Sequence, residues 1–122
     1  MSENISYERY NRQMLLKNFG EAGQKKLTNA SVLVVGAGGL GCPVLQYLAA
    51  AGVGKIGVVD DDVVAITNLH RQVLFSVEDV GYPKVEIAVG KLKKMNPEIS
   101  ITAFNQRLNV ENAIDIMSEF DV

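Results

Sequence analysis

The 122-residue sequence contains one cysteine, one histidine and no tryptophan. A single cysteine excludes an internal disulfide and a multi-cysteine zinc site within this chain. No apolar run approaches the roughly 18 residues that a membrane span needs. The polar start of the sequence also lacks the apolar core of a signal peptide. We therefore expect a soluble, cytoplasmic protein with no membrane partner.

Charge of neither sign dominates the sequence. It has 12 basic and 14 acidic residues, which give a formal net charge of -2. This balance gives no reason to expect nucleic acid as a partner, so any cationic site must be local. With 48% hydrophobic residues, the chain has the composition of an ordinary globular protein and suffices for one domain.

Hydrophobic patterns predict strands and helices in regular alternation. Continuous apolar runs predict parallel strands at 31–35, 55–60 and 99–104, because strands covered on both faces lack polar alternation. Helices are predicted at 7–19, 21–29, 40–52, 83–95 and 109–120. The β-α-β-α-β-α order predicts an α/β protein with a Rossmann-like, doubly wound parallel sheet. Residues 1–30 are expected to form a helical extension, and residues 31–122 the core of the nucleotide-binding part.

The predicted helices differ in the surface that they should bury. Helix 40–52 is apolar almost all round and is expected to be buried. Helices 83–95 and 109–120 each have one apolar face that should point inward. These faces carry Val85, Ala88, Val89, Leu92 and Met95 in the first, and Val110, Ala113, Ile114 and Met117 in the second.

The last two residues, Asp121 and Val122, look like the opening of a fourth strand. We therefore expect the chain to be the N-terminal part of a longer protein, truncated before that strand. A frayed tail is the alternative interpretation.

The turn after the first strand, "VVGAGGLG", has the G-x-G-x-x-G spacing of nucleotide-binding loops. Gly36 allows the tight turn, Gly38 lets the backbone approach a phosphate, and Gly41 lets the helix lie close to the strand. The helix that follows points its free N–H groups at the ligand. Asp60 ends the second strand, where a carboxylate would bind ribose hydroxyls. The alternative is a glycine turn that serves only packing.

Basic residues near the acidic strand end favour a triphosphate over a dinucleotide. Arg71 and Lys84 follow that strand, while Arg9 and Arg12 precede the first one. ATP with magnesium carries negative charge that such side chains would offset. A NAD-dependent oxidoreductase and a non-catalytic nucleotide-binding scaffold stay open as alternatives.

Five segments, "RYNRQ", "GAGGLG", "GVGKIGVVD", "TNLHRQ" and "VGYPKVE", occur in this order along the chain. Their order and spacing resemble the ThiF/MoeB/HesA-type adenylyltransferases, relatives of the ubiquitin-activating enzymes. The resemblance runs from about residue 9 to residue 97. Its N-L-x-R-Q stretch is a specific marker that ordinary dehydrogenases lack.

The resemblance implies ATP-dependent adenylation of the C-terminal carboxylate of a ubiquitin-like sulfur-carrier protein. That carboxylate attacks the α-phosphate of ATP, and pyrophosphate leaves. Because the nucleophile is already an anion, positioning and charge neutralisation can carry the step without a histidine or serine base.

The resemblance also implies roles for individual residues. Arg12 resembles the arginine that family members insert into the partner subunit's site, which implies a homodimer. Asp60 would bind the ribose, while Asn68, Arg71 and Lys84 would lie on the phosphate side. The candidate catalytic residues are Arg12, Arg71 and Lys84, and the candidate nucleotide-binding residues are Gly36, Gly38, Gly39, Gly41, Asp60, Asn68, Arg71 and Lys84.

Parts of the family pattern are missing from the chain. The family's magnesium-binding aspartate would lie beyond Val122, and the paired cysteines of its zinc site are absent. We assign no metal ligand within the chain and expect it to be inactive alone. The carrier's pathway, of thiamin, molybdopterin or another type, stays open, as does adenylation of a peptide or a tRNA base. Cys42, among apolar neighbours, is expected to be a packing residue rather than a catalytic thiol.

Overall fold

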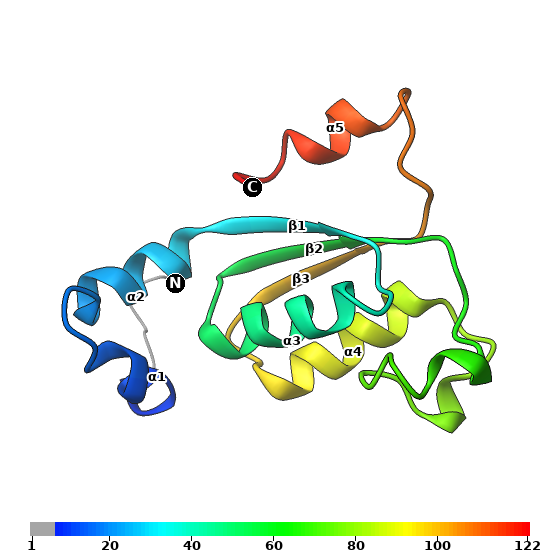
Figure 1. Cartoon of the computed structure of the whole chain (residues 1–122). Coiled ribbons are helices and arrows are strands. Elements are labelled where there is room, and N and C mark those ends of the chain that lie inside the picture. The colour runs from blue at the N-terminus through cyan, green and yellow to red at the C-terminus, as the bar shows by residue number, and fades with distance from the viewer. Residues whose placement is uncertain (1–6) are drawn as a thin grey trace.

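A computed structural model describes residues 7–122 and contains one parallel sheet of three strands (Figure 1). The strands are β1 (Ser31–Val35), β2 (Lys55–Val59) and β3 (Ser100–Phe104), in the spatial order β1-β2-β3. The α-helices are α1 (Tyr7–Met14), α2 (Gly20–Asn29), α3 (Gly41–Ala51), α4 (Lys84–Met95) and α5 (Ala113–Met117). The 3-10 helices are η1 (Ile66–Asn68) and η2 (Val77–Asp79). The predicted α/β class and Rossmann-like parallel sheet are thereby confirmed.

The main core lies between the sheet and one layer of helices. Figure 1 shows α3 and α4 side by side beneath the three strands. Ile56 and Val58 of β2 point into this layer, where Leu45 of α3 and Leu92 of α4 are fully buried. Each such side chain stabilises the fold by about 1.5–3 kcal/mol relative to an exposed one.

A shorter segment covers the opposite face of the sheet, where α5 lies (Figure 1). The ring of Phe120 packs on Gly57 of β2, because a Cβ atom there would lie 2.4 Å from the Phe120 Cζ atom. The same ring meets Phe104 edge-to-face, with the centroids 6.2 Å apart, and the Lys55 ammonium lies 4.7 Å from its centroid. Helical segments therefore lie on both faces of the sheet, as a doubly wound fold requires.

Asp121 and Val122 run along the free edge of β1. Both of their N–H groups donate to the Ser31 carbonyl, at 3.1 and 3.2 Å, and the Leu33 N–H donates to the Val122 carbonyl at 2.8 Å. This pairing supports the predicted strand opening over the frayed tail.

The prediction for residues 109–120 is wrong in two respects. The helix covers only Ala113–Met117, because the Asn109 and Asn112 side chains accept hydrogen bonds from neighbouring backbone N–H groups and form a turn instead. Val110, Ile114 and Met117 do not face inward, since they are 87%, 79% and 53% exposed. The buried side chain of this helix is Ile116.

Helix α3 is also less buried than its composition predicts. Cys42, Leu45 and Ala49 face the sheet and are buried, but Tyr47 is 77% exposed and Val44 is 46% exposed. Only one face of a helix reaches the sheet, and no other element of the described chain covers the far side of this one. The first helix likewise ends at Met14 rather than at residue 19, and Asn18 turns the chain with φ at 68°.

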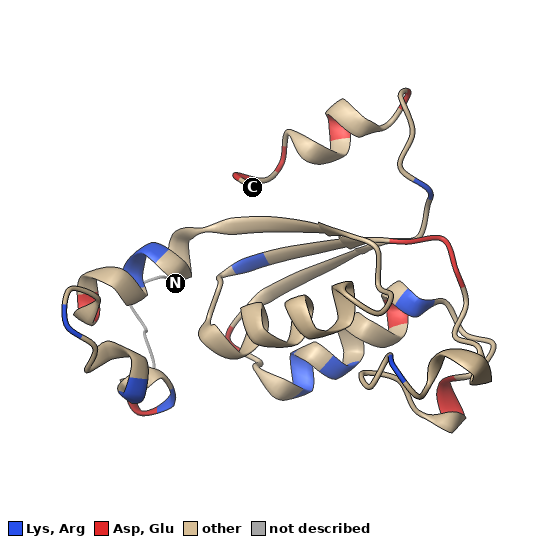
Figure 2. Ribbon diagram, in the orientation of Figure 1, with Lys and Arg blue, Asp and Glu red and all other residues tan. Residues whose placement is uncertain are grey.

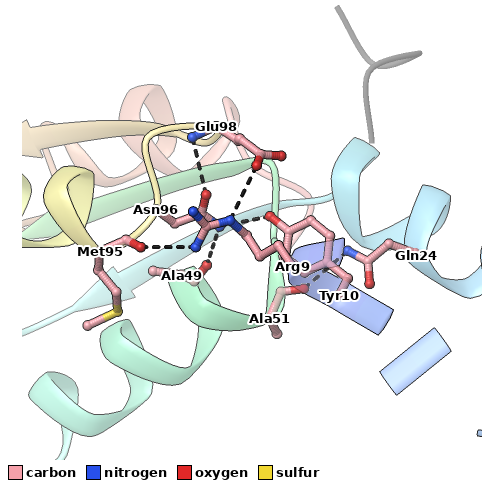
Figure 3. A network of polar contacts seen from close by, with 8 residues as sticks. All are labelled: Arg9, Tyr10, Gln24, Ala49, Ala51, Met95, Asn96 and Glu98. Carbon is pink, nitrogen blue, oxygen red and sulfur yellow. Dashed lines mark hydrogen bonds and ion pairs between the residues drawn. The ribbon is translucent and has the colours of Figure 1, made fainter. Parts of the chain in front are cut away.

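A buried polar network fixes α1 to the ends of α3 and α4 (Figure 3). The Asn96 amide is fully buried and donates at 2.8 Å to the Tyr10 hydroxyl and at 2.8 Å to the Ala49 carbonyl. Arg9 donates to the Met95 carbonyl at 3.2 Å and forms an ion pair with Glu98. The accepting carbonyls lie in the last turns of α3 and α4, where few intrahelical donors remain.

Gln24 extends this network to α2. It is fully buried and donates to the Ala51 carbonyl at 3.2 Å. Gln13 donates to the same carbonyl at 2.8 Å and to the side-chain oxygen of Gln24.

Within the described residues, no helix is long and apolar enough to cross a membrane.

We predict that Asn96→Ala lowers the free energy of unfolding by about 2 kcal/mol, because it removes the three hydrogen bonds of a fully buried side chain. Urea denaturation measures this change as a lower midpoint at an unchanged slope. Asn105→Ala, at an exposed position, is the control and should stay within about 0.5 kcal/mol of the parent. Equal midpoints for both variants would contradict the structural role of the network.

Candidate functional site

The predicted site residues gather where β1 and β2 end. The glycine turn follows β1, and residues 60–62 follow β2. Figure 2 shows the acidic segment at this edge of the sheet, with basic positions on the same side at the start of α4 and in the loop before it. Ligands of doubly wound sheets bind in the crevice outside the carboxyl ends of the strands, so the location fits a ligand site.

Two glycines of the turn are required by geometry. Gly36 has φ at 99°, in the left-handed region, and its N–H donates to the Val59 carbonyl at 2.7 Å. A Cβ atom at Gly41 would lie 2.0 Å from the Gly36 carbonyl oxygen. Gly36 and Gly41 therefore allow the turn and the close approach of α3, in the manner that the motif predicts.

The other two glycines leave the backbone accessible. Among the described residues, no protein acceptor meets the N–H groups of Gly38, Gly39 and Leu40. Gly39 and Leu40 are exposed, and α3 begins at the next residue. Consecutive free N–H groups just before a helix form a favourable site for an anion such as phosphate.

Asp60 connects the glycine turn to the end of β2. One carboxylate oxygen accepts from the Ala37 N–H at 2.7 Å, and the other accepts from the Asp62 N–H at 2.8 Å. Each oxygen keeps a further lone pair for a hydroxyl donor. The side chain is partly exposed, so a ligand can reach these lone pairs.

A pocket of about 280 Å³ lies beside Asp60. It lies between the ends of β1 and β2 and the loop after β3. Its lining includes Val35, Asp60, Asp61, Gln106, Arg107 and Leu108. The sequence analysis missed the last three residues. The rule that parallel strands bring their carboxyl ends together could have found them, because they closely follow the third strand.

The segment after η1 lies against the glycine turn. The Arg71 Cδ and Nε atoms are 3.9 Å from the place of a Cβ atom on Gly39, and Gln72 Nε2 is 3.9 Å from that on Gly38. Arg71 is exposed, whereas Gln72 is 2% exposed. The Asn68 carbonyl accepts from the N–H groups of both residues, at 3.1 and 2.8 Å. The structure thus brings Arg71 to the free N–H groups, and Asn68 shapes the turn that carries it.

Lys84 lies at the start of α4, as predicted, but it is only 5% exposed. The Lys84 ammonium lies 3.8 Å from an Asp62 carboxylate oxygen. The Lys84 backbone N–H also donates to the Asp62 carbonyl at 3.0 Å. The Asp62 side chain is 74% exposed, but it has a defined partner. It provides the counter-charge for a largely buried ammonium.

The carboxylates of Asp60, Asp61 and Asp62 approach one another within 4.8 Å. Such oxygen donors suit Mg²⁺. However, Asp60 already accepts two backbone hydrogen bonds and Asp62 pairs with Lys84. The cluster therefore offers few uncommitted ligands, and we assign no metal site to it.

The structure does not bring Arg12 to this site. Arg12 is an exposed residue of α1, and α1 lies at the end of the molecule where the strands begin (Figure 1). The glycine turn lies at the opposite end of the sheet. Within one chain, Arg12 is therefore remote from the other candidate residues.

Cys42 is fully buried at the start of α3, and its thiol donates to the Ala37 carbonyl at 3.4 Å. Burial raises the pKa of the Cys42 thiol, and the nearby Lys84 ammonium only partly opposes this effect. A neutral, inaccessible thiol is a poor nucleophile. The structure thus supports a packing role for Cys42.

The chain matches the model of the ThiF family over residues 10–122. It therefore belongs to the ThiF family. It is 54% identical over 115 residues to the sulfur carrier protein adenylyltransferase of Thermus thermophilus, covering 94% of this chain and 42% of that protein. It is 56% identical over 117 residues to the adenylyltransferase and sulfurtransferase UBA4 of Kluyveromyces lactis, covering 95% of this chain and 26% of that protein. The chain thus spans less than half the length of these curated relatives.

Solved structures of other proteins are also similar to this chain in fold. E. coli MccB with ATP matches with a TM-score of 0.80 and 35% identity, covering 95% of this chain and 36% of that one. E. coli tRNA N6-threonylcarbamoyladenosine dehydratase, TcdA, in complex with ATP, matches with a TM-score of 0.85 and 29% identity, covering 92% of this chain and 45% of that one.

We predict that Cys42 of the native chain reacts with a disulfide reagent roughly 100-fold more slowly than in urea, because reaction requires local opening of the fold. The absorbance of the released thiol at pH 8 follows the reaction. Native labelling at the unfolded rate would show that Cys42 is an accessible thiol instead.

Proposed function

We propose that the protein containing this chain is an ATP-dependent adenylyltransferase. Its substrate would be the C-terminal carboxylate of a ubiquitin-like sulfur-carrier protein. One observation carries the proposal: three free N–H groups of the glycine turn lie beside Arg71, next to a pocket that contains Asp60. The printed names of the Thermus and Kluyveromyces relatives support the same activity.

The proposed arrangement places each part of ATP on a different feature of the site. Asp60 accepts hydrogen bonds from the ribose hydroxyls, and the base occupies the adjacent pocket. The phosphates then extend along the N–H groups of Gly38, Gly39 and Leu40, towards Arg71 and Lys84. A triphosphate suits these donors better than a nicotinamide does, because several positive and N–H groups converge there.

The reaction requires little beyond this positioning. An oxygen of the carrier's carboxylate forms a bond to the α-phosphorus, and the bond from that phosphorus to the bridging oxygen breaks. The products are an acyl-adenylate and pyrophosphate, which takes the electron pair of the broken bond. Arg71 and Lys84 would offset the negative charge that accumulates on the leaving pyrophosphate. A magnesium ion would offset further negative charge of the phosphates, and we assign no ligand for it within the described residues.

We further propose a homodimer in which Arg12 enters the site of the partner subunit. The support is that Arg12 is exposed and lies far from the site of its own chain. The chain alone would then form only part of each site and would not turn over. Thiamin-type and molybdopterin-type carriers both fit these features, and the cytoplasm is the proposed location.

One experiment distinguishes the adenylyltransferase from a NAD-dependent oxidoreductase and from a non-catalytic scaffold. The full-length protein is titrated with ATP–magnesium and with NAD, and exchange of labelled pyrophosphate into ATP is measured in the presence of a carrier. Preference for NAD would support an oxidoreductase, while ATP binding without exchange would support a non-catalytic scaffold. ATP binding with exchange is the expected result.

We predict that Arg71→Ala in the full-length protein lowers kcat/KM for adenylation by about 10- to 100-fold, the effect of losing a charge-assisted contact. The free energy of unfolding should change by less than about 0.5 kcal/mol, because Arg71 is exposed. Lys93→Ala, which removes an exposed charge of α4, is the control with normal activity. Normal adenylation by the Arg71 variant would refute the phosphate assignment.

If each site needs Arg12 from the partner subunit, two inactive variants should restore activity when they form mixed dimers. When Arg12→Ala and Asp60→Ala chains are co-expressed, half of the dimers are mixed and each mixed dimer has one intact site, so about a quarter of wild-type activity should return. Pyrophosphate exchange by the purified mixture, compared with each variant alone, measures the rescue. Absence of rescue in mixed dimers of normal stability would count against sharing.

A further inference from the structure

The wall of the pocket opposite Asp60 depends on a side chain outside the pocket. Residues 106–108 form this wall and have no regular secondary structure. Gln106 and Arg107 are exposed, so burial does little to fix them. Leu108 is partly buried, whereas hydrogen bonds hold the two exposed residues.

Asn112 supplies these bonds. Its side-chain N–H₂ group donates to the Gln106 side-chain oxygen at 2.9 Å and to the Arg107 carbonyl at 3.0 Å. Its side-chain oxygen accepts from the Asn109 N–H at 2.8 Å. The oxygen and the N–H₂ group of this amide thus both have partners. If the amide were rotated by half a turn, its N–H₂ group would face the Asn109 N–H, and two donors would meet.

Few other bonds restrain this wall. The Gln106 N–H donates to the Phe104 carbonyl at 2.9 Å, which ties the loop to β3. Among the described residues, no other side chain makes a hydrogen bond to residues 106–108. The position of the wall therefore follows the position of the Asn112 amide.

Asn112 is itself firmly placed. Its N–H and that of Glu111 donate to the Asn109 side-chain oxygen, at 3.0 and 2.9 Å. The two asparagines thus bond reciprocally just before α5, whose Ile116 is buried. A partly buried amide anchored in this way can orient an exposed loop.

We propose that Asn112 is a positioning residue for the nucleotide, on the condition that the proposed function is correct. It holds residues 106–108 at the distance from Asp60 that admits a base, before ATP arrives. Loss of this order would weaken ATP binding, because the loop must then be ordered at the expense of binding free energy. The phosphate contacts lie on the glycine turn and Arg71, so the chemical step should keep its rate.

The test is steady-state adenylation by the full-length protein with Asn112→Asp. This change keeps the shape and the oxygen that accepts from Asn109, but it replaces the N–H₂ donor by a carboxylate oxygen facing two acceptors. We expect KM for ATP to rise by about 3- to 10-fold, the equivalent of roughly one neutral hydrogen bond spent on ordering the loop, with kcat and KM for the carrier unchanged. Asn105→Asp, which adds the same charge at an exposed position of the same loop, should leave all three values unchanged.

Asn112→Ser removes the two donor contacts without adding charge and should raise KM for ATP to a similar extent. Thermal unfolding of each variant establishes that the chain is folded. Wild-type KM for ATP in both Asn112 variants would overturn the proposal, as would an equal rise in the Asn105 control. Failure of the wild-type protein to bind ATP would instead refute the proposed function, so the two failures are distinguishable.

Discussion

A single carboxylate fixes the spacing between the two loops on which the site depends. Asp60 accepts one hydrogen bond from the glycine turn and one from the acidic segment, at 2.7 and 2.8 Å. Hydrogen bonds to an ionised acceptor are roughly twice as strong as neutral ones. The glycine turn therefore keeps its place relative to β2, although several of its own N–H groups have no partner among residues 7–122. A ligand that needs those N–H groups finds them already oriented.

The two ends of the sheet differ in how their polar backbone groups are satisfied. At the amino ends of the strands, buried amides such as Asn96 and Gln24 satisfy the last carbonyls of neighbouring helices. At the carboxyl ends, donors are left accessible and cations lie beside them. Unpaired polar groups are costly only where water cannot reach them. The free donors of the glycine turn are tolerated because Gly39 and Leu40 are exposed to water.

Most of the fold could be predicted from local sequence patterns. Buried parallel strands produce continuous apolar runs, and β1 was predicted with its observed bounds. The fit of Gly36 and Gly41 to the turn was also predictable, because their roles follow from backbone sterics. Burial of α3 and α5 was predicted less well, since a helix's composition does not say which of its faces has a partner.

The limits of sequence reasoning are clearest at the site itself. The residues 106–108 carry no motif, and their place beside Asp60 follows from the strand order rather than from local pattern. The pairing of Asp62 with Lys84 also required the structure, because those residues are joined by a loop whose path the sequence does not reveal. Arg71 and Gly39, in contrast, were assigned to one site from the family resemblance, and the structure places them side by side.

The missing side chain at Gly57 has a consequence for the end of the chain. The Phe120 ring fits over β2 only because Gly57 has no side chain, which leaves room for the ring. An alanine would displace the ring from β2 and from its edge-to-face partner Phe104. The pairing of Val122 with the border of β1 would then lose its anchor, and a bare strand border invites association with other chains. The order of this border of the sheet thus depends on the absence of a side chain at position 57.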